Sequence, residues 1–164
     1  MSPNTKGRFL LITGVPSTGK SCYCGHLRDA HGFCVVLTDC EPSFINEAVA
    51  RTAGLVDRFL KQHANVAIEW GFHTKFLQKA LDLGRQGARL VWFAGDAARA
   101  QSDHAKKTHN HPARLKEFDD QMRRIREAAL PTNEFQIVRA LDKDGFHPHR
   151  EIDREVLGTA WGEQ

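Results

Sequence analysis

The sequence predicts an α/β fold, in which a mostly parallel β-sheet carries helices on both faces. Three observations point to it. Short apolar runs alternate with segments of helical spacing, a glycine-rich loop directly follows the first apolar run, and no repeat or linker divides the chain. With 164 residues, of which 41% are hydrophobic and 26% charged, the chain is expected to form one domain around a single core.

The predicted strands are short apolar runs. The first comprises residues 8–13 (RFLLIT) and stops at Gly14, as a buried parallel strand that leads into a turn would do. Four further runs follow the same pattern, the last of them more weakly: residues 33–38, 66–69, 89–94 and 135–138.

Between these runs, apolar residues recur at intervals of three or four, the spacing of a helix with one buried face. One such set is Phe72, Phe76, Ala80 and Leu83, which Gly84 and Gly87 terminate. A longer set, ended by Pro131, is Leu115, Phe118, Met122, Ile125 and Ala129. Strands and helices that alternate in this way form right-handed crossovers, and such sheets bind ligands at the carboxyl ends of their strands.

Charge and cysteine content narrow the classes of function. A net charge of +3 is compatible with an anionic ligand but is too small to indicate nucleic-acid binding. The four cysteines are Cys22, Cys24, Cys34 and Cys40, and without an export signal they predict free thiols rather than disulfides. The apolar run near the start, residues 9–12, is far too short to span a membrane. We therefore expect an untargeted, soluble, cytoplasmic protein with no membrane partner.

The strongest motif is the loop that follows the first predicted strand. Residues 14–21 (GVPSTGKS) match G-x-x-x-x-G-K-[ST] in full and lead into a predicted helix. The glycines allow the backbone N–H groups to converge on phosphate oxygens, and the helix N-terminus adds a favourable dipole. The alternative is a glycine-rich turn with an exposed lysine. The residues expected to contact a nucleotide are Gly14, Val15, Pro16, Ser17, Thr18, Gly19, Lys20, Ser21 and Cys22.

The order of motifs along residues 8–140 resembles that of the P-loop kinases. Strands that end at the loop, at Asp39, at Glu69 and at Asp96 are followed by a basic helical segment. The resemblance is to the branch that contains polynucleotide kinases, zeta-toxin-like and chloramphenicol phosphotransferases, gluconate and shikimate kinases and adenylate kinases. It implies a five-stranded parallel sheet of order 2-3-1-4-5 and Mg-ATP as phosphoryl donor. It also implies a single domain over residues 1–164, with a lid at about residues 97–114.

Asp39 is the predicted general base. An apolar run delivers its carboxylate to the carboxyl edge of the sheet, where relatives that phosphorylate hydroxyl groups have an Asp that accepts or orients the acceptor's proton. The alternative is a carboxylate that caps the turn or helix at Pro42 and Ser43. Polynucleotide kinases have an arginine shortly after this Asp, whereas Cys40 and Glu41 follow here. This departure disfavours a phosphorylated or nucleic-acid acceptor.

Lys20, Ser21 and Glu69 are the predicted phosphate and metal ligands. Lys20 would reach the β- and γ-phosphates, and the Ser21 hydroxyl would coordinate Mg²⁺. Residues 66–69 (VAIE) match the Walker B pattern, in which a strand-end carboxylate holds the metal through water, although relatives usually have Asp there. The alternatives are that Glu69 orients a substrate or is a simple strand-end acid. The aromatic residues that follow, Trp70, Phe72 and His73, would either stack on an acceptor ring or pack.

The basic segment after Asp96 is the predicted lid. Arg99 lies nearest the first lid arginine of the relatives and is the third predicted catalytic residue, with Lys20 and Asp39. Lys106 and Lys107 stand where relatives have a later arginine pair, and lysine lacks the bidentate fork of arginine. The alternative is a solvated helix face. Zinc-ligand spacing is missing among the nearby histidines, which are His104, His109 and His111.

Together these features predict a kinase, an ATP-dependent phosphotransferase that moves the γ-phosphoryl group of Mg-ATP to a hydroxyl acceptor. The acceptor would be a small molecule, a nucleoside or a polynucleotide 5′ end. The missing arginines motivate an alternative, an ATP-binding regulatory module that hydrolyses ATP slowly or not at all. Nucleic-acid binding is a third, disfavoured hypothesis. The sequence contains no guanine-binding N-K-x-D signature, and it leaves the acceptor and the oligomeric state open.

Overall fold

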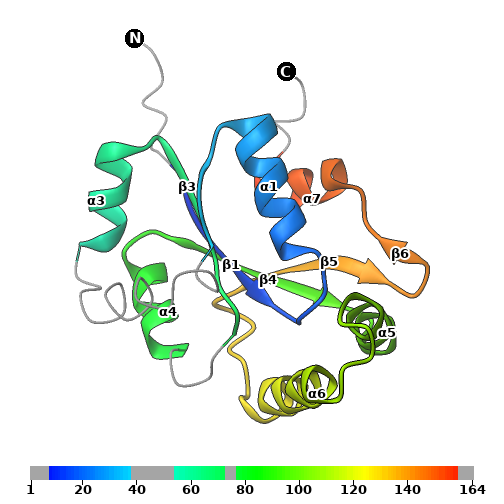
Figure 1. Cartoon of the computed structure of the whole chain (residues 1–164). Coiled ribbons are helices and arrows are strands. Elements are labelled where there is room, and N and C mark those ends of the chain that lie inside the picture. The colour runs from blue at the N-terminus through cyan, green and yellow to red at the C-terminus, as the bar shows by residue number, and fades with distance from the viewer. Residues whose placement is uncertain (1–7, 38–53, 73–76, 159–164) are drawn as a thin grey trace.

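In the computed structural model, helices cover both faces of a central six-stranded sheet (Figure 1). The structure describes residues 8–37, 54–72 and 77–158. The strand order is β2-β3-β1-β4-β5-β6. The predicted α/β class is therefore confirmed, and the first five strands have the order 2-3-1-4-5.

Five parallel strands form the body of the sheet, because apolar runs of this kind are stable when helices bury them on both sides. β1 pairs with β3 on one side and with β4 on the other. β2 extends the sheet beyond β3, and β5 extends it beyond β4. The bounds are β1 Arg8–Gly14, β2 Cys34–Leu37, β3 Asn65–Glu69, β4 Arg89–Gly95 and β5 Gln136–Asp142.

A sixth strand corrects the predicted count of five. β6 (Gly145–Phe146) pairs antiparallel with the end of β5. The Asp142 carboxylate accepts hydrogen bonds from the backbone N–H groups of Asp144 (2.8 Å) and Gly145 (3.1 Å), which closes the connecting turn. Apolar content does not reveal this strand, because it is only two residues long and its pairing is set by the turn.

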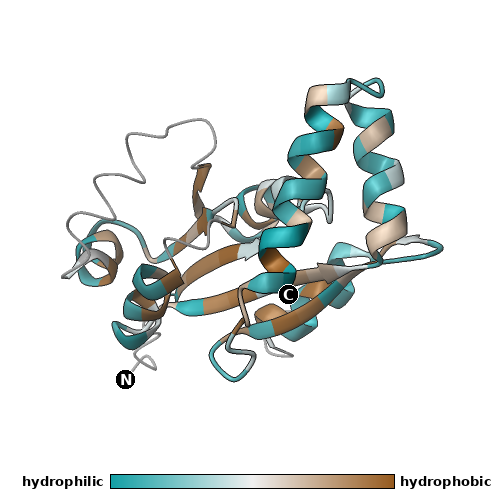
Figure 2. Cartoon of the chain, turned by 90° about the horizontal axis from the view of Figure 1, so that it is seen from below, coloured by the Kyte–Doolittle hydropathy of each residue, from teal (hydrophilic) through white to brown (hydrophobic). Residues whose placement is uncertain are grey.

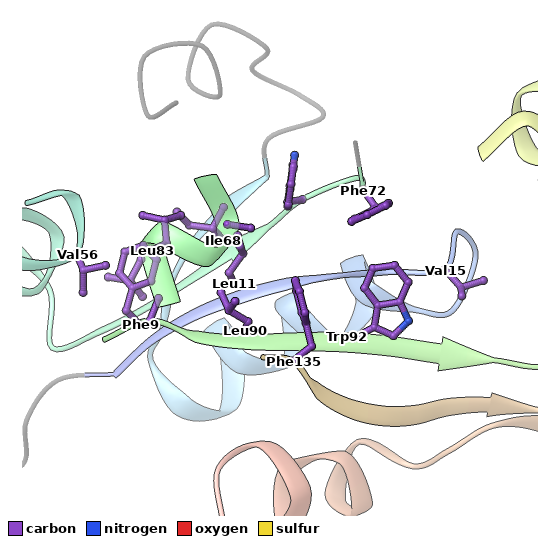
Figure 3. Packing of buried hydrophobic residues seen from close by; sticks show 14 of the residues in the cluster. Phe9, Leu11, Val15, Val56, Ile68, Phe72, Leu83, Leu90, Trp92 and Phe135 are labelled. Atoms are coloured by element: carbon purple, nitrogen blue, oxygen red, sulfur yellow. The ribbon is translucent and has the colours of Figure 1, made fainter. Parts of the chain in front are cut away.

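Helices pack against both faces through the alternate residues of the strands. Leu10 and Ile12 of β1 belong to a buried cluster with residues of α1 and α7. Phe9 and Leu11 belong to the opposite cluster, with residues of the other helices (Figure 3). The helix bounds are α1 Lys20–His31, α3 Leu55–Gln62, α4 Leu77–Arg85, α5 Ala97–Lys107, α6 Pro112–Glu127 and α7 His149–Val156.

The helices α5 and α6 form a hairpin that projects beyond the sheet (Figure 2). Most residues of the hairpin are hydrophilic, whereas the strands are mostly hydrophobic. Across the three described ranges, no helix has both the length and the apolar character that crossing a bilayer requires.

Two predicted helix patterns differ from the structure at their ends. Phe72 precedes α4 and packs edge-on against Trp92, with ring centroids 5.0 Å apart, while Phe76 lies outside the described residues. At the second pattern, Ala129 lies beyond the end of α6 and has a φ of 45°. Pro131 disfavours the helical conformation in the residue before it, so the helix ends earlier than the apolar spacing predicts.

A polar contact joins α1 to α7. Asp153 of α7 accepts a hydrogen bond of 2.9 Å from the Tyr23 hydroxyl, and it lies 2.8 and 2.9 Å from ring nitrogens of His26 and His31. Burial by itself would raise the pKa of the Asp153 carboxyl, but the three hydrogen bonds outweigh burial and hold this pKa below its ordinary value. The ionised carboxylate therefore fixes the two helices to each other.

We expect Asp153→Asn to lower the free energy of unfolding by about 2 kcal/mol near neutral pH, because charge-assisted hydrogen bonds are lost. The pKa of Asp153 is lower in the folded chain than the ordinary 3.8, so its contribution is present above that value and disappears as the pH falls through the folded-state pKa. Urea unfolding at about pH 7 and about pH 3 in metal-free buffer measures both effects. The exposed Asp29→Asn on α1 is the control. An equal loss at both pH values would contradict the prediction.

Candidate functional site

The loop between β1 and α1 depends on two glycines. At Gly14 φ is 133°, and a Cβ there would lie 2.3 Å from the carbonyl oxygen of Phe93, so only glycine fits. The backbone N–H of Val15 donates to that same carbonyl at 2.9 Å. Gly19, with φ 84°, is the N-cap of α1. Residues 15–19 thus lead from the strand end directly to a helix N-terminus, where anions bind favourably.

Lys20 lies inside this loop. Only 9% of its surface is exposed, and its Nζ donates to the carbonyl of Val15 at 2.8 Å. The Thr18 hydroxyl donates to the same carbonyl, also at 2.8 Å. Lys20 is therefore not the exposed lysine of the alternative interpretation.

The structure brings the two predicted magnesium ligands together. The hydroxyl of Ser21, in the first turn of α1, donates to Oε1 of Glu69 at 2.7 Å. Glu69 ends β3 and is 6% exposed. A hydroxyl and a carboxylate are hard oxygen ligands of the kind that Mg²⁺ prefers. The pair therefore fits the ion that the sequence predicts.

A cleft of about 520 Å³ lies beside this pair. The loop and the start of α1, the end of β3, the helices α5 and α6, and β6 all contribute residues to its lining. Its lining consists of Pro16, Ser17, Gly19, Lys20, Ser21, Cys22, Glu69, Gly71, Asp103, His104, Lys107, Gln121 and Phe146. Six of the nine residues predicted to contact a nucleotide thus line one cleft.

The arrangement matches a solved structure over nearly the whole chain. A gluconokinase from Sinorhizobium meliloti 1021 superimposes with a TM-score of 0.60, and the match covers 94% of this chain and 93% of that one. The chain has the P-loop kinase fold. The two sequences are 19% identical in this match. No protein-family model matches the chain, and neither does any curated protein sequence.

The aromatic residues after Glu69 pack rather than face the cleft. Trp70 and Phe72 are 5% and 3% exposed, and their ring centroids lie 6.1 Å apart. Of the two interpretations of this turn, packing is the one that the structure supports for these residues. Two other predicted site residues, Asp39 and His73, lie outside the described part of the chain.

The predicted lid segment is formed by α5 and the start of α6. Nε of Arg99 lies 3.1 Å from each carboxylate oxygen of Asp103, and a terminal nitrogen of the guanidinium donates to the carbonyl of Lys143 at 3.3 Å. Arg99 is not among the residues that line the cleft, whereas Lys107, on the same helix, is. Of the cations of α5, the one in the cleft lining is therefore Lys107 and not Arg99.

His104 links the P-loop to the helical hairpin. Its Nε2 lies 3.1 Å from the carbonyl of Arg114, and its Nδ1 lies 3.1 Å from the Ser17 hydroxyl. A carbonyl oxygen only accepts, so Nε2 carries the proton and, in the neutral ring, Nδ1 accepts from Ser17. One imidazole thus connects the phosphate loop, α5 and α6.

From the sequence alone, His104 is weighed only as a zinc ligand, and neither Gln121 nor Phe146 is predicted to belong to a site. The positions of Asp103, His104 and Lys107 at i, i+1 and i+4 would place them on one side of α5. The sequence does not tell which side of α5 faces the P-loop, because that depends on how the helix packs. The position of Phe146 depends on the pairing of β6. The edge of its ring would lie 3.3 Å from a Cβ placed on Gly19.

We expect His104→Ala to lower the free energy of unfolding by about 1 kcal/mol, because two hydrogen bonds of a half-buried ring are lost. It should also speed amide hydrogen exchange in both the P-loop and α5, since the ring connects them. Exchange measured by mass spectrometry tests this, with the exposed Lys106→Ala on the same helix as the control. Faster exchange confined to α5 would show that the P-loop does not depend on this link.

Proposed function

We propose that the protein is an ATP-dependent phosphotransferase that moves the γ-phosphoryl group of Mg-ATP to a hydroxyl group of a small molecule. The observation that carries the proposal is the P-loop with Lys20 buried inside it and the Ser21–Glu69 pair 2.7 Å apart at its edge. The P-loop kinase fold supports the same class of reaction.

The P-loop would hold the triphosphate. Backbone N–H groups of residues 17–19 and the N-terminus of α1 favour negative charge at this end of the cleft. The carbonyl of Val15 accepts a hydrogen bond from Lys20 and so positions its ammonium group. Lys20 would contact the β- and γ-phosphates and stabilise the negative charge that develops on the transferred phosphoryl group. Ser21 and Glu69 would hold Mg²⁺, which when bound neutralises phosphate charge and orients the γ-phosphoryl group.

Asp39 would accept or orient the proton of the acceptor hydroxyl. β2, the strand that precedes it, ends at Leu37, which pairs in register with Glu69. The described end of β2 therefore lies next to the proposed metal pair. The short distance along the chain from Leu37 to Asp39 supports this role.

The α5–α6 hairpin would serve as the lid. Lys107 lines the same cleft as the P-loop and would contribute positive charge there. Arg99 would assist only after its ion pair with Asp103 rearranged. The size of the cleft, about 520 Å³, suits a nucleotide and a small acceptor rather than a polymer. Because the solved neighbour is a gluconokinase, sugar acids are the first acceptors to test.

A second candidate function is an ATP-binding regulatory module. Arg99 is paired with Asp103 and is not itself among the cleft-lining residues, which favours such a module. Such a module would bind Mg-ATP and transfer no phosphoryl group. The two functions therefore share the P-loop and differ in the role of Asp39.

Lys20→Ala should weaken Mg-ATP binding by about 10- to 100-fold, because a charged hydrogen bond to phosphate contributes about 1.5–3 kcal/mol. Calorimetric titration of the purified chain with Mg-ATP measures the change. The control is Lys106→Ala, which removes an exposed cation outside the cleft lining. If Lys20→Ala and the parent bind Mg-ATP equally, the proposed role of the P-loop is wrong.

Asp39→Ala should reduce phosphoryl transfer by at least about 100-fold while Mg-ATP affinity is retained, because a general base acts on the acceptor and not on the nucleotide. The assay follows labelled ATP with a panel of sugar acids, other small hydroxylated metabolites, nucleosides and 5′-hydroxyl oligonucleotides. Glu41→Ala is the matched control for loss of a nearby carboxylate. Transfer that survives in Asp39→Ala would exclude Asp39 as the base, and ATP binding without transfer in the parent would favour the regulatory module.

A further inference from the structure

A cluster of two imidazoles and one carboxylate lies on the α1–α7 face, away from the cleft. We call His26, His31 and Asp153 the His–Asp cluster. The two histidines come from α1, and Asp153 comes from α7, more than a hundred residues later in the chain. Figure 1 shows the two helices on the same side of the sheet. None of the three residues lines the cleft.

Both imidazoles point their Nε2 atoms at one carboxylate oxygen. The distances to Oδ2 of Asp153 are 2.8 Å from His26 and 2.9 Å from His31. One ligand atom from each residue can be chosen so that all three lie within 4.8 Å of one another. A tetrahedral zinc ion with bonds of about 2.1 Å separates its ligand atoms by about 3.4 Å. The nitrogen–oxygen distances therefore need to widen by only about 0.5 Å to admit the ion.

The carboxylate is already oriented by a third group. The Tyr23 hydroxyl donates to the other oxygen, Oδ1, at 2.9 Å, which leaves Oδ2 directed toward the imidazoles. Ligating carboxylates in metal sites are held by outer hydrogen bonds of this kind. The hydrogen bonds to Asp153 keep its pKa low despite burial, so the ligand is ionised at neutral pH.

A third histidine ring borders the cluster without belonging to the ligand set. The ring of His149 lies 4.8 Å from that of His26, centroid to centroid. The side chains of His26 and His31 are 24% and 15% exposed, so solvent still reaches the cluster.

We propose that His26, His31 and Asp153 form a binding site for a divalent transition-metal ion, with two imidazole nitrogens and one carboxylate oxygen as protein ligands. Solvent supplies the fourth ligand. Zinc is the ion that fits this ligand set best among those without redox chemistry, whereas Mg²⁺ and Ca²⁺ prefer oxygen ligands. On binding, the metal takes the place of the two Nε2 protons, and each neutral ring carries its proton on Nδ1 instead.

The bound ion would cross-link the end of α1 to α7. α1 begins at the P-loop with Lys20 and ends at His31, so the ion would anchor the helix that carries the phosphate loop. Because an unfolded chain does not hold these ligands together, zinc would stabilise the folded state. This site is independent of the proposed phosphotransferase activity and is tested without it.

The test uses the full chain, freed of metal by chelation and dialysis, and titrates it with zinc chloride in a calorimeter. We expect one zinc per chain and a rise in the thermal midpoint. Tyr23→Phe should weaken binding by about tenfold through loss of the outer hydrogen bond. His26→Gln and His31→Gln should weaken it more, while each glutamine amide still donates to Asp153 and keeps the helices joined. His63→Gln, which changes an exposed histidine elsewhere, should bind zinc as the parent does.

Cobalt spectroscopy identifies the ligands independently of stability. Co²⁺ bound by the His–Asp cluster should give visible bands of nitrogen and oxygen ligation without the near-ultraviolet band of thiolate ligation. A thiolate band would assign the metal to cysteine and overturn the proposal. So would the absence of stoichiometric binding by the parent, or unchanged zinc affinity in folded His26→Gln and His31→Gln, whose folding circular dichroism verifies.

Discussion

The backbone contact between Gly14 and Phe93 is the constraint on which the site depends. The strands β1 and β4 approach so closely there that a Cβ at Gly14 would lie 2.3 Å from a carbonyl oxygen. The chain consequently leaves the sheet with a φ of 133°, and the Val15 N–H bonds to the same carbonyl. The carbonyl of Val15 then accepts from Thr18 and Lys20. One steric requirement in the sheet thus determines where the phosphate loop and its lysine lie.

The helix α1 connects two regions of different chemistry. Its first turn carries Lys20 and Ser21 at the cleft, and its last residue, His31, lies beside Asp153. Between them, Tyr23 and Leu27 are buried against the sheet. The face of α1 that packs on the sheet is apolar, whereas the two ends of the helix carry these polar groups. An ion at the His–Asp cluster would therefore act on the same rigid element that begins at the P-loop.

The part of the cleft lining that α5 and α6 supply differs from a simple cationic lid. Arg99 forms an ion pair with Asp103, and Lys107 is the cation of α5 in the cleft lining. His104 of α5 is joined to the P-loop by its hydrogen bond with the Ser17 hydroxyl. Hydrogen bonds of His104 with Ser17 and of Arg99 with the carbonyl of Lys143 thus hold the hairpin next to the cleft, and closure over a nucleotide would have to break or rearrange them.

The sequence by itself determined the α/β class, the order of the five parallel strands through family resemblance, and the phosphate loop, because these depend on local apolar runs and on contiguous residues. It also predicted Ser21, from the loop motif, and Glu69, from the acid at the end of its strand, as ligands of one ion, and the structure brings the two side chains together. It did not determine β6, the cleft residues of α5 and α6, or the meeting of His26 and His31 with Asp153. β6 is too short to show an apolar pattern, and its pairing depends on the turn that Asp142 closes. The other two features join residues that are distant in the chain and carry no local pattern, so only the packing of helices and strands decides them.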